Sequence, residues 1–387
     1  MSDFDFFDLF SIDEDEPVSK SKKTKCMTLE DWPKLPNEIK QMVISNLGFD
    51  TRLNLSLCSK SDYENVKNSR MKIKEMHIVE EEIWIYGVYE NPVKFVNIEI
   101  DFDFERHERY ELKFVKDGDS DCVLVGRYGH QYKKKKSVCT KNDYKSEAFN
   151  FAIHCMRRCD FKIRHLTVEM EECSFQSNLI KDFKHLEYLR LSSSNEDQIL
   201  WWMEKAKQSK LKTLTFCKNG STERNGTLSS KFMDKVYPQL NECDSFYFWA
   251  CPLFSDHQFL SLKPKVMNFD VGSTLSDQTI NIFIRNWVDG RIRKDFAQFI
   301  GWMKRGYQKE LILKNLDAKL WDDEFIDNSR GFTFDFERVV GRGDCYQVQN
   351  KCYADISATL MLSSDRITFL VTGRIHNNYM SYSVPVT

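Results

Sequence analysis

An apolar triplet recurs through the centre of this 387-residue chain, between residues 160 and 316. Each copy places apolar residues at positions i, i+3 and i+5, and the middle residues of successive copies lie 23, 25, 32, 23 and 42 residues apart. Units of this length bury their apolar faces by stacking on one another, so the pattern predicts an array. The copies are Ile163/Leu166/Val168, Leu186/Leu189/Leu191, Leu211/Leu214/Phe216, Cys243/Phe246/Phe248, Val266/Phe269/Val271 and, in weaker form, Leu311/Leu313.

Leucine-rich repeats have this spacing, with a strand at each triplet and a helix returning along the other face. The intervening segments predict helices at residues 175–179, 194–206, 231–240 and 276–287, of which the second and fourth begin at the N-caps Ser194 and Ser276. The Asn or Cys expected after the triplet is present only as Asn219 and Cys251. The repeats are therefore degenerate, and ordinary α/β packing with coincidental spacing is the alternative.

Alternation with a period of two flanks the repeats and predicts antiparallel strands. Upstream it covers residues 96–104, 110–114 and 122–125, followed by a predicted helix at 142–159. Lys133–Lys136 reads as a charged hairpin tip, with a nuclear-import signal as the alternative.

Downstream, alternation returns in Phe332/Phe334/Phe336 and in two runs, 356–362 and 367–371, around a hairpin at 363–366. These strands would cap the open edge of the repeats.

The composition narrows the class of protein. Gly and Pro together number 23, which favours long, continuous secondary structure. The 56 basic and 58 acidic residues leave a net charge of −2, so no global charge attracts nucleic acid or an anionic membrane. The acidic start does not form a secretory signal, and no apolar run approaches a membrane span. We expect a cytoplasmic or nuclear protein with reduced, mostly buried cysteines.

No sequence motif for catalysis is present. The chain lacks the phosphate-binding, dinucleotide-binding, nucleophile-elbow and zinc-protease patterns. Any of the twelve cysteines could be activated by a nearby base, but no pattern selects one. His154, Cys155 and Cys159 offer three metal ligands without a second pair at zinc-like spacing. The sequence therefore predicts no catalytic residue, no metal and no cofactor.

The amino-terminal tail is divided by charge. Residues 1–16 hold seven acidic side chains and no basic one, whereas residues 20–25 hold four lysines. Opposite charge blocks beside Pro17 predict a flexible tail. The alternative is an amphipathic peptide that docks through Phe4, Phe6, Phe7, Leu9 and Phe10.

Residues 29–69 predict three short helices. Pro36 suits a first helical turn, and an apolar stripe follows it at Ile39, Val43 and Leu47, with Met42 and Ile44 beside it. Gly48 ends this helix, Asp50 is the expected cap of the second, and Ser59 or Ser61 of the third. About forty residues bury too little surface to be stable alone, so the helices have to pack on a partner or on the rest of the chain.

This stretch resembles an F-box, which opens with Leu-Pro, continues with Glu-Ile and closes near a Cys/Val-Ser-Lys step. The matching positions are Leu35, Pro36, Glu38, Ile39, Val43, Ile44, Leu47, Leu53, Leu57, Cys58, Ser59 and Lys60. Tyr63 stands where many F-boxes have Trp, a substitution that a large aromatic residue should tolerate. The ending at residues 57–63 and the later segment 275–290 look like the nematode F-box proteins with their F-box-associated domain.

The resemblance implies a function. F-box proteins bind the Skp adaptor, which joins them to a cullin and a RING-bound ubiquitin-conjugating enzyme. Leu35 and Pro36 would lead this contact, and the other apolar residues would divide between contact and internal packing. The residues implied in adaptor binding are Leu35, Pro36, Glu38, Ile39, Val43, Ile44, Leu47, Leu53, Leu57 and Cys58.

The predicted fold class is α+β: a three-helix F-box, a β meander and a leucine-rich-repeat-like α/β solenoid capped by antiparallel strands. The predicted parts are a disordered tail (1–28), the F-box (29–70), an antiparallel β region (71–140) and a substrate-recognition domain (141–387).

The function that we expect is the non-catalytic substrate-recognition subunit of an SCF-type (Skp–cullin–F-box) ubiquitin ligase, which binds a protein substrate through its repeats. The alternatives are a Skp-bound scaffold or decoy without ligase activity, and a cysteine-dependent hydrolase.

Overall fold

The computed structural model describes residues 32–83, 93–102, 109–117, 121–128, 131–138, 143–171, 178–217, 227–271, 275–303, 306–321, 344–353 and 356–371. The chain divides into two compact units, Met1–Leu186 and Glu187–Thr387. Its fold class is α+β, which confirms the prediction. The finer division into four parts stays a prediction.

The first unit begins with four short helical elements: η2 (Trp32–Lys34), α1 (Asn37–Ile44), α2 (Phe49–Ser56) and α3 (Lys60–Asn68). Ser59 caps α3, because its side chain accepts a hydrogen bond from the amide of Asp62. The expected cap at Asp50 is wrong. Gly48 already has the extended backbone of an N-cap, so α2 starts at Phe49 and Asp50 lies inside it.

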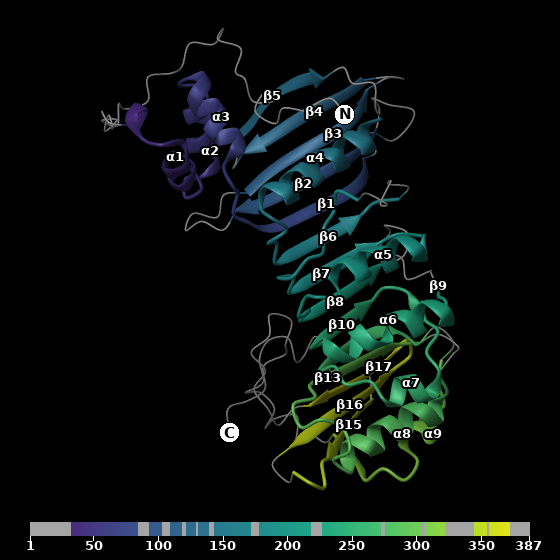
Figure 1. Cartoon of the computed structure of the whole chain (residues 1–387). Coiled ribbons are helices and arrows are strands. Elements are labelled where there is room, and N and C mark those ends of the chain that lie inside the picture. Colours follow the sequence, from purple (N-terminus) through teal and green to yellow (C-terminus); the bar gives the residue numbers. More distant parts are fainter. Residues whose placement is uncertain are drawn as a thin grey trace. The chain divides into compact units, whose positions relative to one another are not determined.

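The sheet of the first unit is an antiparallel meander with one parallel strand at its side (Figure 1). The order β6-β1-β2-β3-β4-β5 places β6 (His165–Glu169) beside β1 (Ile73–Ile83). The remaining strands are β2 (Val93–Phe102), β3 (Arg109–Asp117), β4 (Asp121–Tyr128) and β5 (Gln131–Val138).

Helix α4 (Tyr144–Arg158) covers one face of this sheet and packs on β2, β3 and β4. The alternation decides which side chains meet it: Val96, Ile98 and Ile100 are buried, and Phe114 of β3 lies 5.7 Å from Phe151 of α4 between ring centroids.

The expected hairpin tip at Lys133–Lys136 is wrong. Tyr128 of β4 pairs with Gln131, so the reversal precedes the lysines and they lie within β5.

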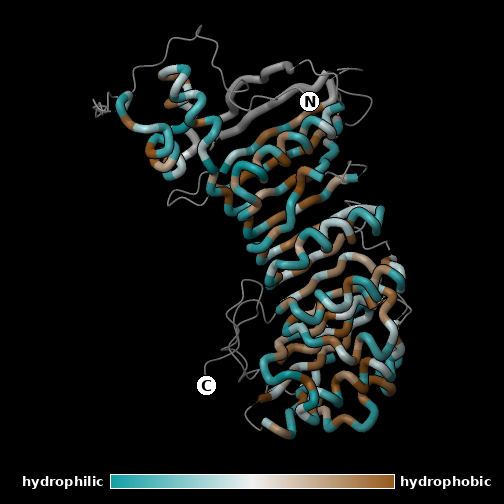
Figure 2. Tube along the Cα trace, in the orientation of Figure 1, coloured by the Kyte–Doolittle hydropathy of each residue, from teal (hydrophilic) through white to brown (hydrophobic). Residues whose placement is uncertain are grey.

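The second unit alternates parallel strands with helices, as the triplets predict. Its parallel strands are β7 (Tyr188–Ser192), β8 (Thr213–Cys217), β10 (Ser245–Phe248), β12 (Val266–Asp270) and β13 (Gln298–Trp302). The connecting helices are α5 (Glu196–Ala206), α6 (Ser230–Glu242), α7 (Asp256–Leu260) and α8 (Asp277–Val288). Hydrophilic and hydrophobic residues alternate along these helices (Figure 2), as is typical of helices that pack on a sheet. Kinship with leucine-rich repeats stays a prediction.

Two details of the repeats differ from expectation. The weak triplet at Leu311/Leu313 is not a strand but the short helix α9 (Lys309–Leu313), and β13 takes the sixth strand position. Ser276 caps α8 as predicted, but Asn195 and not Ser194 caps α5, because the backbone stays extended for one residue more. The helix expected at 175–179 falls mostly outside the described residues.

Antiparallel strands close one side of the second unit. They are β17 (Arg366–Val371), which pairs with β13, then β16 (Ser357–Ser363), β15 (Asp344–Gln349) and β14 (Ala318–Leu320). The two predicted alternating runs are thus confirmed as β16 and β17, whereas Phe332/Phe334/Phe336 lies outside the described residues. A small pair, β9 (Thr227–Leu228) and β11 (Cys251–Pro252), lies apart from this sheet.

Phenylalanine fills the space between the sheet and helices of the second unit. The rings of Phe216 and Phe248 stack at 4.9 Å between centroids, and Phe269 contacts Phe299 at 5.6 Å. On the helix side, Phe283 of α8 lies 5.6 Å from Phe299. Among the helices that the structure describes, none combines the length and apolar composition needed to cross a bilayer.

Candidate functional site

The amino-terminal helices expose large apolar side chains on one face of α1. Ile39, Met42 and Val43 stand at positions i, i+3 and i+4, where side chains are neighbours on a helix. Their exposed fractions are 40%, 59% and 38%, and Leu57, after α2, is 55% exposed. The other exposed large apolar side chains in the described part of the chain are Leu179, Ile282 and Leu320, in separate elements. Grouped apolar exposure of this kind marks a surface for a partner.

A polar frame holds the helices behind this face. The indole Nε1 of Trp32 donates to Oδ1 of Asp62 at 2.8 Å, and the hydroxyl of Ser59 donates to Oδ2 at 2.8 Å. Asp62 is buried, so these bonds satisfy both of its oxygens. The frame therefore fixes η2 against the start of α3.

Two arginines hold these helices, one from within them and one from α4. Arg52 is almost completely buried and donates from Nε to the carbonyl of Leu47 at 3.0 Å and from Nη2 to that of Arg70 at 2.8 Å. Arg158 of α4 donates from Nε to the carbonyl of Ser69 at 3.0 Å and from Nη2 to that of Val66 at 2.6 Å. Burial, followed by the charge of Arg158, lowers the pKa of Arg52 to about 10, so it remains a cation at neutral pH.

The comparison with protein families decides what these helices are. Residues 32–74 match the family model of the F-box domain. Residues 32–74 form an F-box domain. The exposed face of α1 and the polar frame behind it are thus features of an F-box.

A relative extends the similarity beyond the F-box. Over 364 residues the chain is 25% identical to an uncharacterized F-box protein of Caenorhabditis elegans, an alignment that covers 92% of this chain and 92% of the relative. The resemblance to a nematode-type F-box protein is therefore confirmed. No solved structure matches the chain.

The F-box residues predicted to bind the adaptor fall into three groups. Exposed ones are Pro36, Glu38, Ile39, Val43, Leu57 and Cys58. Leu35 and Leu47 are half-buried, and Leu53 lies in α2, with its side chain outside the described part. Ile44 is completely buried and packs inside the first unit. The adaptor contact itself stays a prediction for all of them.

The most exposed residue of the face, Met42, is missing from the predicted set. The signal for it was present, because Met42 is three residues after Ile39 and lies next to Val43 on the same helix. The stripe at Ile39, Val43 and Leu47 follows one row of the helix, and Met42 lies in the row beside it.

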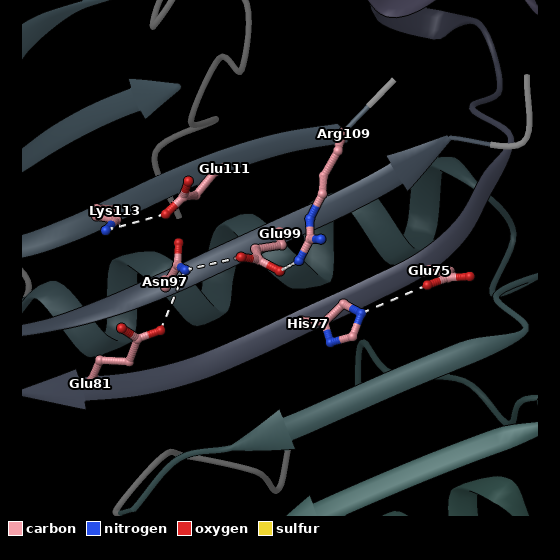
Figure 3. A network of polar contacts seen from close by, with 8 residues as sticks. All are labelled: Glu75, His77, Glu81, Asn97, Glu99, Arg109, Glu111 and Lys113. Atoms are coloured by element: carbon pink, nitrogen blue, oxygen red, sulfur yellow. Dashed lines mark hydrogen bonds and ion pairs between the residues drawn. The ribbon is translucent and has the colours of Figure 1, made fainter. Parts of the chain in front are cut away.

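A second polar surface lies on the sheet face opposite α4 (Figure 3). Asn97 of β2 lies between Glu81 and Glu99 and donates from Nδ2 to each of them, at 3.5 and 3.4 Å. Arg109 of β3 pairs with Glu99, and Lys113 pairs with Glu111 at 3.2 Å. Asn97 is buried, and its Oδ1 accepts no hydrogen bond from the residues that the structure describes.

His77 of β1 lies on the same surface, next to Glu75 (Figure 3). Burial, followed by the charge of Arg109, lowers the pKa of His77, which is therefore neutral at pH 7. Burial tends to raise the pKa of Glu75, but a hydrogen bond from Lys74, followed by nearby positive charge, outweighs burial and lowers this pKa. A neutral His77, 3.9 Å from Glu75, does not form an ion pair with it at neutral pH.

On the strand face away from its helices, the second unit has a row of five aligned side chains. Arg190, Tyr247 and Asn268 are partly exposed, whereas Thr215 and Ile300 are buried. Register aligns Arg190, Thr215, Tyr247, Asn268 and Ile300 across five neighbouring strands. At the end of β13, the indole Nε1 of Trp302 donates to Oδ1 of Asn268 at 3.0 Å. Aromatic and polar side chains in one row are typical of protein-binding surfaces.

Four of the described cysteines are poorly suited to nucleophilic chemistry. Burial raises the pKa of Cys155, and raises those of Cys159 and Cys243 to about 12. Burial and the charge of Asp344 raise the pKa of Cys345 to about 12 as well. These thiols are protonated at neutral pH, whereas a nucleophilic cysteine needs a thiolate. Within the described ranges, no group of three or more His, Cys, Asp or Glu is placed to hold a metal.

Proposed function

We propose that this chain is the substrate-recognition subunit of an SCF-type ubiquitin ligase. The F-box in general supports Skp binding and an adaptor role, and the exposed apolar face of α1 is the observation that carries the proposal. A face that the chain leaves uncovered gains about 25 cal/mol for each Å² that a partner removes from water. Catalysis would then be by proximity, since the receptor holds a substrate lysine near the loaded enzyme.

The substrate surface in this proposal is the strand row of the second unit. Tyr247, Asn268 and Trp302 supply aromatic area and hydrogen-bonding groups on rigid strands, which suits recognition of a folded protein or an extended peptide. The cytoplasm or nucleus is the proposed location, which is supported by the free cysteines among the described residues.

Adaptor binding is tested by substituting two isoleucines of similar exposure, one in each unit. Ile39 on α1 and Ile282 on α8 are 40% and 42% exposed, so each is replaced by aspartate in the full chain. We expect Ile39→Asp to abolish co-purification of the Skp adaptor and Ile282→Asp to leave it unchanged. A Leu35→Ala/Pro36→Ala variant should also lose the adaptor. Undiminished adaptor binding by Ile39→Asp would overturn the proposal.

Co-purification of further proteins with the chain distinguishes a ligase subunit from a scaffold or decoy. A ligase subunit brings cullin and a RING protein into the same complex, and a partner protein accumulates when residues 32–74 are deleted. A Tyr247→Ala/Trp302→Ala variant should lose that partner and keep the adaptor. Recovery of adaptor without cullin, with no change in partner abundance, would favour the scaffold.

A further inference from the structure

The first unit contains a cleft of about 610 Å³. One wall is α1 with its C-cap residue, which together contribute Gln41, Met42 and Ser45. The others are residues 68–73, which lead into β1, and residues 159–164, which connect α4 to β6. Its volume is that of an ordinary ligand site.

The rim of the cleft is strongly basic. Arg70, Lys72, Lys162 and Arg164 line it together with His185, and all five are exposed, whereas Asp160 is its single carboxylate. Lys72 donates to Oδ1 of Asn46 at 2.7 Å. Within the described part of the chain, no carboxylate pairs with Arg70, Lys162 or Arg164. Four cations gathered around one cleft favour an anionic occupant.

The wall at residues 159–164 has a defined backbone. Helix α4 ends in a Schellman motif, in which the amide of Phe161 donates to the carbonyl of Met156 at 2.9 Å and that of Asp160 donates to Arg157 at 3.1 Å. Asp160 and Phe161 both have left-handed backbones, with φ of 54° and 57°. Two consecutive non-glycine residues in this conformation need support from their surroundings, so the basic wall is built in one arrangement.

The chain carries a segment of complementary chemistry. Residues 1–16 hold seven carboxylates, no cation and the apolar residues Phe4, Phe6, Phe7, Leu9 and Phe10. The cleft offers cations at its rim and the exposed apolar side chain of Met42 at its edge, and the buried Met71 and Ile73 lie beneath it. Aromatic residues interleaved with acids match both properties.

The connection between residues 1–16 and the first helices is long enough for the acidic segment to reach the cleft. Residues 17–31 separate the acidic block from Trp32, and about fifteen residues span up to roughly 50 Å when extended. Helix α1 is only about 12 Å long. A short tether gives a local concentration on the order of millimolar, so even a weak contact is populated. We propose that the acidic aromatic segment 1–16 of this chain binds its own basic cleft.

The test is zero-length cross-linking of the full chain with a carbodiimide, which joins a carboxylate directly to a lysine amine. We expect links from carboxylates of residues 1–16 to Lys72 and Lys162, and their loss in about 1 M salt, where charges are screened beyond roughly 3 Å. Arg70→Glu/Arg164→Glu keeps both lysines but reverses two rim charges, and should reduce these links at least about fivefold. The matched control, Lys210→Glu/Lys235→Glu, changes two exposed lysines of the second unit and should have no effect.

Several outcomes would overturn the proposal. Links only to Lys20, Lys22, Lys23 and Lys25 would mean that the tail pairs with itself. Links that persist in Arg70→Glu/Arg164→Glu would mean that the cleft charge is not involved. A mixture of isotope-labelled and unlabelled chains separates links within one chain from links between chains, and links mainly between chains would assign the occupant to a second copy.

Binding of the segment to the cleft would affect adaptor binding, an expectation that rests on the proposed function. Met42 belongs both to the cleft and to the exposed face of α1, so the bound segment competes with the Skp adaptor. Replacing the seven acids by Asn and Gln should tighten adaptor binding at least about threefold. If the cross-links form but both chains bind the adaptor with equal affinity, competition is excluded. Failure of both forms to bind the adaptor would overturn the proposed function and leave the cross-linking result standing.

Discussion

Helices α1 and α8 are both amphipathic, and they differ in what covers their apolar sides. In α8 the residues Ile280, Phe283, Ile284 and Trp287 are buried within the second unit, and of its apolar side chains only Ile282 is exposed. In α1 only Ile44 of the apolar residues is buried, while Ile39, Met42 and Val43 are exposed. The same pattern of sequence thus gives a buried apolar side in α8 and an exposed one in α1.

The means of attachment differ as well. Aromatic contacts hold α8, since Phe283 lies 5.1 Å from Phe259 and 5.6 Å from both Phe296 and Phe299. The F-box is held by hydrogen bonds from arginines and by the Trp32–Asp62–Ser59 frame. With several of its apolar side chains exposed, the F-box has polar bonds that hold its helices in place.

The largest effect should come from Phe283→Ala. Truncating a fully buried phenylalanine removes its transfer free energy and leaves a cavity, which costs about 3–5 kcal/mol of the free energy of unfolding. Urea denaturation and hydrogen exchange in α8 and β13 measure the loss. Ile282→Ala, one position away on the exposed side, is the control and should change stability by no more than about 0.5 kcal/mol. Similar losses in the two variants would contradict the assigned faces of α8.

A smaller and localised effect is expected from Arg158→Met, which keeps much of the side-chain stem. Loss of the charged hydrogen bonds to the carbonyls of Val66 and Ser69 should cost about 2–3 kcal/mol. Amide exchange in α3 should then accelerate roughly 30- to 150-fold. Exchange in the helices of the second unit serves as the internal reference and should not change. Protection of α3 that survives this substitution would show that apolar contacts hold the F-box.

The sequence predicted most of the fold because strands and helices here follow their hydrophobic periods. The triplets correctly marked β6, β7, β8, β10 and β12. Strand β13 was missed because Gly301 stands where the triplet has a large residue. A Cβ atom at Gly301 would lie 2.5 Å from Cγ2 of Val271, so close packing requires glycine at this position. Such a requirement depends on neighbours that a single strand does not show.

The candidate site was predicted less completely. The F-box pattern located the right helices, but Ile44 proved to be buried and Met42, which was left out, is the most exposed residue of the face. Hydrophobic periodicity identifies apolar side chains without distinguishing those that meet their own chain from those that await another. The basic cleft was not predicted at all, because Arg70, Lys72, Lys162 and Arg164 are brought together only by the fold.

Helices α4 and α8 also differ in the residue that ends them. Both helices end in a Schellman motif, with Gly290 at φ 70° after α8 and Asp160 at φ 54° after α4. A side chain at this position has a steric cost that glycine avoids, so Asp160→Gly should stabilise the protein by about 0.5–1 kcal/mol. Asp160→Asn removes the charge but keeps the Cβ atom, and thermal denaturation should show little gain for it. Equal stabilisation by both variants would assign the effect to charge.

The smallest effect on stability is expected from Met42→Ser, although it removes the most exposed apolar side chain of the F-box. A side chain that is 59% exposed contributes little to folding, so the free energy of unfolding should change by no more than about 0.5 kcal/mol. If α1 is an interface, the same substitution should weaken adaptor binding about tenfold, measured by titration calorimetry. Ile282→Ser on α8 should affect neither property. Substantial unfolding by Met42→Ser would mean that α1, like α8, serves its own chain, and the contrast between the two helices would fail.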